Sequence, residues 1–285
     1  MGTPHSIRPS SVSRPARKAE RGGESFAESR EFEWLARAGL AARGVVYGIV
    51  GVLAIKLALG DGGNATNQQG ALRTIAGGTF GKVLLIVLAV GLAGYAIWRL
   101  VRAALGHGPE ASDDTKDRIA GVVSGIVYAG LCVTAVQIIA GAGGGERSGH
   151  PDDTAAGVLG WTGGTYLVAA AGVAFIGVAI DQAIKGVKRK FLEDSKTEQM
   201  SEGVERGFTV LGVTGYLARA VVFSMIGYFL IKAAIDYDPH KAVGVDGALA
   251  KLGQASYGPW LLGIVAAGLL AFGLYSFADA RYRRV

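Results

Sequence analysis

The sequence predicts an all-α integral membrane protein, a bundle of six transmembrane helices built from three tandem two-helix repeats. Three observations lead to this fold class. Half of the 285 residues are hydrophobic, and the mean hydropathy is +0.34. Long parts of the chain carry no charged residue, and one sequence pattern recurs along it. Soluble domains seldom combine such features, so the lipid bilayer is the first partner that the sequence implies.

Six segments are apolar enough to form membrane helices. Three of them contain no Asp, Glu, Lys or Arg over 27 residues each: 119–145, 154–180 and 252–278. A helix rises about 1.5 Å per residue, so about 20 apolar residues cross the hydrocarbon layer. Residues 83–98 form a shorter segment whose flanking Lys and Arg can reach the interface. The remaining two segments, 39–59 and 215–235, each carry one Arg and one Lys.

Basic residues are distributed unevenly along this chain of net charge +6. If the N-terminus is cytoplasmic, 20 Lys and Arg residues lie in or beside the inner segments and five in the outer ones. Such a bias predicts a multi-pass protein of the cell membrane with both termini in the cytoplasm. The positive charge then reflects topology and gives no support for a nucleic-acid partner. Anionic lipid headgroups at the cytoplasmic face are the expected polar partner.

Residues 1–33 are polar and lack the apolar core of a signal peptide. We expect them to form a disordered cytoplasmic tail, and the first membrane helix to act as its own insertion signal. The end of this tail and the residues after it, "FAESREFEWLARAGL", have the pattern of a short interfacial helix that would rest Trp34 against the bilayer.

The first and third repeats overlay without a gap. The segment "GLAARGVVYGIVGVLAIKLAL", which starts at residue 39, aligns with "GYLARAVVFSMIGYFLIKAAI", which starts at residue 215. The aligned pairs are Arg43 with Arg219, Tyr47 with Phe223, Gly51 with Gly227 and Lys56 with Lys232. The pairing of one Arg with one Lys in each of these helices is therefore part of the repeat.

The middle repeat matches more weakly. Its first helix keeps an aromatic residue at Tyr128 but has Ser124 in place of the arginine and Gln137 in place of the lysine. Its second helix matches only in character. The repeats span residues 34–106, 116–190 and 207–283. Each crosses the membrane twice, so all three enter from the same side, which predicts a pseudo-threefold arrangement about the membrane normal.

The motifs of the repeat resemble those of a known bacterial membrane family. They are an A-R-x-x-V-Y/F start, a G-A-L-x-x-L/I loop and an aromatic-Gly step into a G-L-x-x-Y/F helix. In the first repeat they fall on Ala42, Arg43, Val46, Tyr47, Gly70, Ala71, Leu72, Ile75, Phe80, Gly81, Gly91, Leu92 and Tyr95. The chain is similar, over all but its tail, to the family of domain of unknown function 1206. The resemblance implies an integral multi-helix membrane protein without an assigned activity.

The Arg and Lys of the first helix point in different directions. They are 13 positions apart, which at 100° per residue places them about 140° apart around the helix axis. Lys56 follows an apolar, lipid-facing stripe close to the outer end of the helix. Lys56 and Lys232 are therefore predicted to be snorkelling anchors at the outer headgroups.

Arg43 lies on a different face of the helix, together with small residues and Tyr47. Another helix is expected to pack against this face. A charge facing a bundle interior costs roughly 2.5 kcal/mol or more unless it is paired or hydrated. Its possible partners are helix-end carbonyls, lipid phosphate, Asp181 and Asp279. The candidate intramembrane functional residues are Arg43, Tyr47, Arg219 and Phe223.

Other motifs carry no chemistry that we can support. The segment Ala76–Val83 lacks the first Gly and the final Ser/Thr of a phosphate-binding loop. The groups at His150–Asp153 and Asp236–His240 are better explained as turns than as a metal site. There is no G-x-S-x-G, H-E-x-x-H or C-x-x-C motif. The sequence therefore indicates no catalytic residue, no metal ligand and no cofactor, and we expect a protein that is not an enzyme.

Two functions remain. The first is a non-enzymatic scaffold or interaction protein of the cytoplasmic membrane that acts through its tail and basic inner loops. The alternative is a channel or carrier for a small solute or ion through the centre of the three-repeat bundle. Polar residues at mid-depth are few, chiefly Thr134, Gln137, Thr214 and Ser224. A permeation path for ions or sugars needs more, so the scaffold is the favoured reading.

Overall fold

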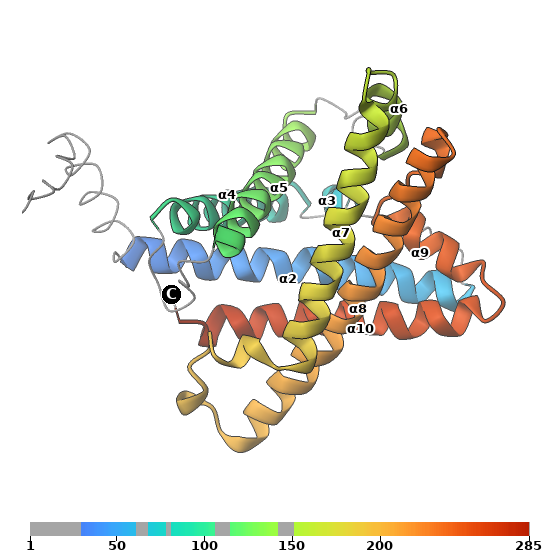
Figure 1. The fold of residues 1–285 in the computed structure, drawn as a ribbon. Coiled ribbons are helices and arrows are strands. Elements are labelled where there is room, and N and C mark those ends of the chain that lie inside the picture. Colours follow the sequence, from blue (N-terminus) through green and yellow to red (C-terminus); the bar gives the residue numbers. More distant parts are fainter. Residues whose placement is uncertain (1–29, 61–67, 78–80, 106–114, 142–150, 285) are drawn as a thin grey trace, which may run out of the picture.

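The computed structural model describes residues 30–60, 68–77, 81–105, 115–141 and 151–284. Six long helices dominate it (Figure 1): α2 (Arg30–Leu59), α4 (Gly81–Leu105), α5 (Thr115–Ile139), α7 (Gly164–Val187), α8 (Glu202–Ile235) and α10 (Gly258–Tyr282). All six are long and apolar enough to cross a membrane. The described residues include no β-strand beyond one isolated bridge. The predicted all-α, multi-pass fold is confirmed.

Helix α2 begins earlier than expected. Residues 30–38, predicted as part of a separate interfacial helix, run without a break into the membrane helix. Trp34 is exposed, as a residue at the membrane interface would be. The remainder of that predicted interfacial helix, and the predicted disorder of the tail, lie outside the described residues.

Short helices stand where the sequence indicated loops. They are α3 (Gln68–Ala76), α6 (Pro151–Leu159) and α9 (Val245–Gly253), with 3-10 turns at η1 (Lys190–Leu192), η2 (Thr197–Gln199) and η3 (Pro239–Lys241). The repeated G-A-L segment lies in α3 and α9, so its assignment to a loop was wrong. Its apolar residues recur at helical spacing and are buried, with Leu72 and Leu249 both at 0% exposure. Burial of this stripe against the bundle outweighs the turn tendency of the glycine.

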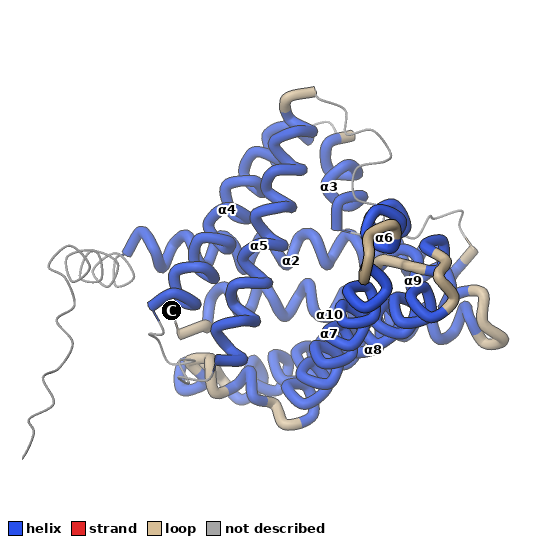
Figure 2. The backbone as a smooth tube through the Cα atoms, turned by 45° about the horizontal axis from the view of Figure 1, so that its top comes forward, coloured by secondary structure: helices blue, strands red, loops and turns tan. Residues whose placement is uncertain are grey.

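The long helices form three closely packed pairs, α2 with α10, α4 with α5, and α7 with α8 (Figures 1 and 2). Glycines permit the close approach. A Cβ atom on Gly273 would lie 2.8 Å from the backbone nitrogen of Gly48, and one on Gly172 would lie 2.8 Å from the carbonyl oxygen of Gly227. Each pair joins the second helix of one repeat to the first helix of the next, taken cyclically.

The ring of helices has one weak link. Within the first repeat α2 packs on α4, and within the third α8 packs on α10, but α5 and α7 of the middle repeat do not pack closely against each other. The two helices are also the most exposed, with 17% of the span of α5 and 22% of the span of α7 buried, against 56% for α2. The cyclic order agrees with three related repeats, whereas threefold symmetry about a membrane normal stays a prediction.

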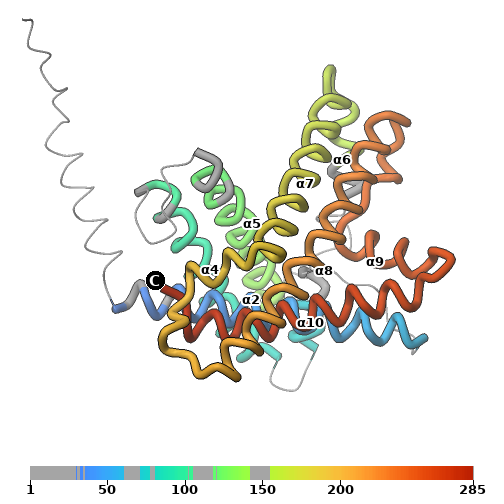
Figure 3. Tube along the Cα trace, turned by 60° about the horizontal axis from the view of Figure 1, so that its bottom comes forward, coloured from blue at the N-terminus to red at the C-terminus, as the bar shows by residue number. Residues whose placement is uncertain are grey.

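The start of α2 lies beside the end of α10 (Figure 3). Arg37 donates hydrogen bonds from Nη1 to the carbonyl oxygens of Ala280 at 2.8 Å and Arg281 at 2.6 Å. It also bonds Glu33, one turn earlier, and this hydrogen bond lowers the pKa of the Glu33 carboxyl. Arg37 thus caps the last carbonyls of α10 and joins the first long helix of the bundle to the last one.

Candidate functional site

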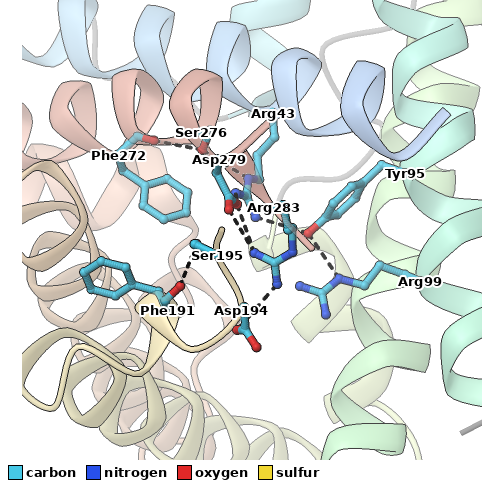
Figure 4. Close-up of polar contacts among 10 residues, drawn as sticks. All are labelled: Arg43, Tyr95, Arg99, Phe191, Asp194, Ser195, Phe272, Ser276, Asp279 and Arg283. Atoms are coloured by element: carbon cyan, nitrogen blue, oxygen red, sulfur yellow. Dashed lines mark hydrogen bonds and ion pairs between the residues drawn. The ribbon is translucent and has the colours of Figure 1, made fainter. Parts of the chain in front are cut away.

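Arg43 is buried at 5% exposure and is bonded through all of its nitrogens (Figure 4). Nε donates to Ser276 Oγ at 3.1 Å, Nη1 to the Tyr95 hydroxyl at 3.1 Å, and Nη2 to Asp279 Oδ2 at 3.0 Å. The acceptors come from α4 and α10, on either side of α2. The planar guanidinium fork therefore joins three helices at one point.

Asp279 is the centre of this charge cluster. It is fully buried and accepts hydrogen bonds from two arginines, Arg43 and, one helical turn later, Arg283. Arg283 Nη1 lies 3.2 Å from Oδ1 and 3.0 Å from Oδ2, and Arg283 Nη2 lies 3.7 Å from Asp194 Oδ2. A buried carboxylate is tolerated when such partners replace its hydration shell.

The Tyr95 hydroxyl links a third arginine to the cluster. It accepts a hydrogen bond from Arg99 Nε at 3.1 Å as well as from Arg43. The Arg99 guanidinium also lies over the rings of Tyr95 and Trp98, with its carbon 5.4 and 5.2 Å from their centroids. Among the described residues, three arginines and two aspartates meet here, which gives this part of the cluster a net charge of +1.

The segment between α7 and α8 closes over the charge cluster. Lys196 N donates to the carbonyl oxygen of Tyr282 at 2.7 Å, and Arg284 N donates to that of Asp194 at 2.9 Å. Ser195 is fully buried and donates from Oγ to the carbonyl oxygen of Phe191 at 2.9 Å. The backbone of this loop is thereby bound to the end of α10 and brings Asp194 to Arg283.

The Phe191 ring anchors the same loop in the core. It stacks on Tyr216 with centroids 5.4 Å apart and meets Phe208 and Tyr275 edge-on. A Cβ atom on Gly212 would lie 2.5 Å from this ring, so the glycine gives Phe191 its space. The loop is part of the packed fold of the third repeat.

Arg219 occupies the position in α8 that Arg43 has in α2, but its surroundings are aromatic. Its guanidinium carbon lies 4.4 Å from the centroid of Phe272, 5.2 Å from that of Phe223 and 5.3 Å from that of Tyr47. Its Nε is buried and has no hydrogen-bond partner. Arg43 also lies against Phe272, at 5.1 Å. Three of the four predicted site residues, Arg43, Tyr47 and Arg219, thus contact the ring of Phe272, and the fourth, Phe223, contacts Arg219.

The structure selects among the partners proposed for Arg43. Asp279 bonds it, whereas Asp181 pairs with Lys185 on its own helix at 3.0 Å. Lys56 and Lys232 are exposed near the ends of α2 and α8, where anchors would lie, and their role stays a prediction.

Sequence reasoning missed several members of the charge cluster. Ser276, Arg99 and Arg283 were not named as site residues, and Tyr95 appeared only as a repeat motif. One signal was available for Arg283, because it follows Asp279 by four residues, the spacing of an ion pair on one helix face. Arg99 likewise follows its partner Tyr95 by four residues. The contacts of Arg43 with Tyr95, Ser276 and Asp279 join residues far apart in the chain.

The group at Asp236–His240 forms a turn and a surface ion pair, as predicted, whereas Pro151 and the two residues after it begin helix α6, so their assignment to a turn was wrong. Asp238 accepts a hydrogen bond from the backbone nitrogen of His240, and Lys241 Nζ lies 2.8 Å from Asp236 Oδ2. This contact lowers the pKa of Asp236 and raises that of Lys241. Among the described residues no group of three or more His, Cys, Asp or Glu side chains could hold a metal ion; His150 lies outside them.

Comparison with known proteins identifies the repeats. The family model described as Domain of Unknown Function (DUF1206) matches three times, at residues 38–106, 119–189 and 214–283. The chain is 36% identical over 252 residues to a protein of Bacillus subtilis (strain 168) named "Uncharacterized protein YxxB", an alignment that covers 87% of this chain and 90% of the relative. No solved structure matches significantly. The chain therefore belongs to the DUF1206 family, whose domain it carries in three tandem copies.

Proposed function

We propose that the protein is a non-enzymatic scaffold of the cytoplasmic membrane, with both chain ends and the α7–α8 loop on the cytoplasmic side. One observation carries the proposal. Arg43, the buried charge that would be the first candidate for a conduction path, gives all of its nitrogens to the protein's own residues. A charge bound in this way holds helices in place and is not available to a passing solute.

The packing around Arg43 supports the same reading. Tyr47, Phe272 and Tyr216 meet edge-to-face beside it, with centroids 4.9 Å apart for the first two and 5.5 Å for the last two. Aromatic rings packed in this manner fill space and resist displacement. The interior where the first and third repeats meet thus favours a rigid body over a polar conduit.

The surface at the end of α7 suggests what the scaffold faces. Lys188, Arg189 and Lys190 are exposed in succession, directly after the last turn of the helix. On the cytoplasmic side each would contribute about 1 kcal/mol toward an anionic leaflet. Because the following loop is bound to the end of α10, these charges are presented from a fixed position. Anionic lipid headgroups are therefore the proposed first partner of this surface.

The test is a measurement of solute flux and ionic current on purified protein in liposomes, with empty liposomes and a reconstituted channel of known conductance as controls. A scaffold is expected to give the same values as empty liposomes for ions, sugars and amino acids. Flux that exceeds this background and changes in Arg43→Ala would reject the scaffold and establish the channel or carrier.

A second arm addresses the basic surface. The variant with Lys188→Gln, Arg189→Gln and Lys190→Gln is compared with Lys232→Gln in nanodiscs of phosphatidylglycerol and phosphatidylcholine. Native mass spectrometry then counts the lipids that stay with each protein. The triple variant is expected to lose its enrichment of phosphatidylglycerol while Lys232→Gln keeps it, and equal enrichment in both would remove this surface from the proposal.

A further inference from the structure

Arg219 has no anionic partner, although its equivalent in the first repeat has one. Arg43 is neutralised by Asp279 at 3.0 Å. Within the described parts of the chain, Arg219 makes no ion pair and donates no hydrogen bond. Its contacts are with the faces of Tyr47, Phe223 and Phe272. Aromatic rings attract a cation but offer no oxygen acceptor for its N–H groups.

The two ends of this guanidinium differ in access. Nε is enclosed by protein. Nη1 and Nη2 also have no described acceptor. Unlike Nε, they are not enclosed by protein, and the residue as a whole is half-buried. The fork of Nη1 and Nη2 is therefore the part of Arg219 that a ligand can reach, and three rings hold it in a fixed orientation.

The positive charges of Arg43 and Arg219 favour the binding of an anion. Arg43 and Arg219 contact the same ring, Phe272, at 5.1 and 4.4 Å. The carboxylate that balances Arg43 is shared with Arg283 and makes no ion pair with Arg219. A guanidinium fork matches the oxygens of a phosphate group in a bidentate manner. In a membrane, phosphate is supplied by lipid headgroups and by the adjoining aqueous phase.

Side chains of α5 and α7 flank this region. The side chain of Phe223 packs on Phe175 of α7, with centroids 6.1 Å apart, and Tyr128 of α5 packs against the rim of the core. Because α5 and α7 do not pack closely on each other, no helix interface closes the bundle between them.

We propose that Arg219 is a binding residue for a phosphate group, held by its terminal nitrogens inside an aromatic frame of Tyr47, Phe223 and Phe272. The site does not depend on the scaffold proposal, since a bound phosphate is compatible with a static bundle and with a conducting one. It is distinct from the surface of Lys188, Arg189 and Lys190, which lies at the end of α7.

The experiment compares the full-length protein with Arg219→Gln, Arg219→Lys and, as a matched control, Arg206→Gln, which removes an exposed arginine from the same helix. Each protein is stripped of lipid in detergent and titrated with phosphatidylglycerol, with inorganic phosphate, and with phosphate-free diacylglycerol. Apparent melting temperature reports stabilisation by a ligand, and native mass spectrometry counts bound lipid. Circular dichroism checks that each variant is folded.

We expect phosphatidylglycerol or inorganic phosphate, and not diacylglycerol, to raise the melting temperature of the wild type. Arg219→Gln should bind about tenfold more weakly or worse, since a charge-assisted bidentate contact is lost. The affinity of Arg219→Lys should lie between those of the wild type and Arg219→Gln, and the affinity of Arg206→Gln should match that of the wild type. Binding of phosphatidylglycerol alone identifies a lipid headgroup as the source, and binding of inorganic phosphate identifies free phosphate. Equal affinities in wild type and Arg219→Gln, or no binding of either ligand, would overturn the proposal.

Discussion

The two arginines at equivalent positions of the first and third repeats have different partners. Arg43 is bonded to Ser276, Tyr95 and Asp279, whereas Arg219 is framed by aromatic rings and has no described acceptor. The difference comes from the next helix in the ring. Helix α10 offers a buried carboxylate to α2, while the acid of α7, Asp181, pairs with Lys185 on its own helix. A repeat therefore conserves the position of a charge without conserving its environment.

The largest expected effect is at Arg43. Replacement by Ala leaves Asp279 with half of its ion pairs and empties a buried volume, and removal of one partner of a buried pair typically costs about 3–5 kcal/mol. We expect a loss of this size in the free energy of unfolding, measured by circular dichroism in mixed micelles with increasing dodecyl sulfate. Lys185→Ala, at a partly exposed pair with Asp181, should cost less than about 1 kcal/mol. Equal losses in the two variants would contradict the central role of Asp279.

A smaller effect is expected at the α2–α10 interface, which brings Asp279 to Arg43. Gly273→Ala places a methyl group 2.8 Å from the backbone of Gly48, and backbone cannot move aside as a side chain can. We expect a loss of about 1–3 kcal/mol in the same unfolding measurement. Gly48→Ala is the matched control, because a Cβ atom there meets nothing within 4 Å. A loss at Gly48 as large as that at Gly273 would show that the interface is packed differently.

Substitution of Arg219 tests whether an arginine without an ion pair contributes less to stability than Arg43. Arg219→Met removes contacts with three rings, worth about 0.5–1 kcal/mol each at exposed sites. It also removes an unsatisfied buried nitrogen, whose burial costs about 1–3 kcal/mol. These terms oppose each other, so in lipid-free micelles we expect a net change of less than about 1 kcal/mol. Arg43→Met should lose several times more. A loss at Arg219 that equals the loss at Arg43 would mean that the two arginines are equally well paired.

The smallest effect concerns an exposed ion pair, Asp236 with Lys241. The pKa of Asp236 is lowered from its ordinary 3.8 by the hydrogen bond from Lys241, so its contribution to stability is present above pH 3.8 and is lost as pH falls through the lower folded value. The pKa of Lys241 is raised from 10.5, so its contribution is present below that pH and is lost as pH rises through the raised value.

Lys241→Ala is expected to flatten both limbs of the melting-temperature curve slightly, because solvent screens the pair. The same acid limb in wild type and variant would show that the pair is not populated. Compared with Arg43→Ala, this variant measures how much of the effect of an ion pair comes from burial.

Much of the fold follows from local features of the sequence. The six membrane helices were predictable from runs of apolar residues, and the repeats from direct alignment of residue 39 onward with residue 215 onward. Asp279 was predictable as a candidate partner because it lies near the end of a membrane helix. The short helices α3 and α9 were not, since their G-A-L segment was assigned to a loop and the helix is favoured by burial of Leu72 and Leu249 in the folded bundle.

The sequence by itself determined the membrane class, the family and the number of long helices, because the length and apolar character of a segment decide whether it partitions into a bilayer. The tertiary structure decided which helices are neighbours, and therefore which partner each charged side chain has. Arg43 reaches residues 52, 233 and 236 positions away in the chain, and Arg219, in a similar local sequence, reaches aromatic rings. A side chain's charge is a property of its residue, whereas the partner that neutralises it depends on which helix packs opposite.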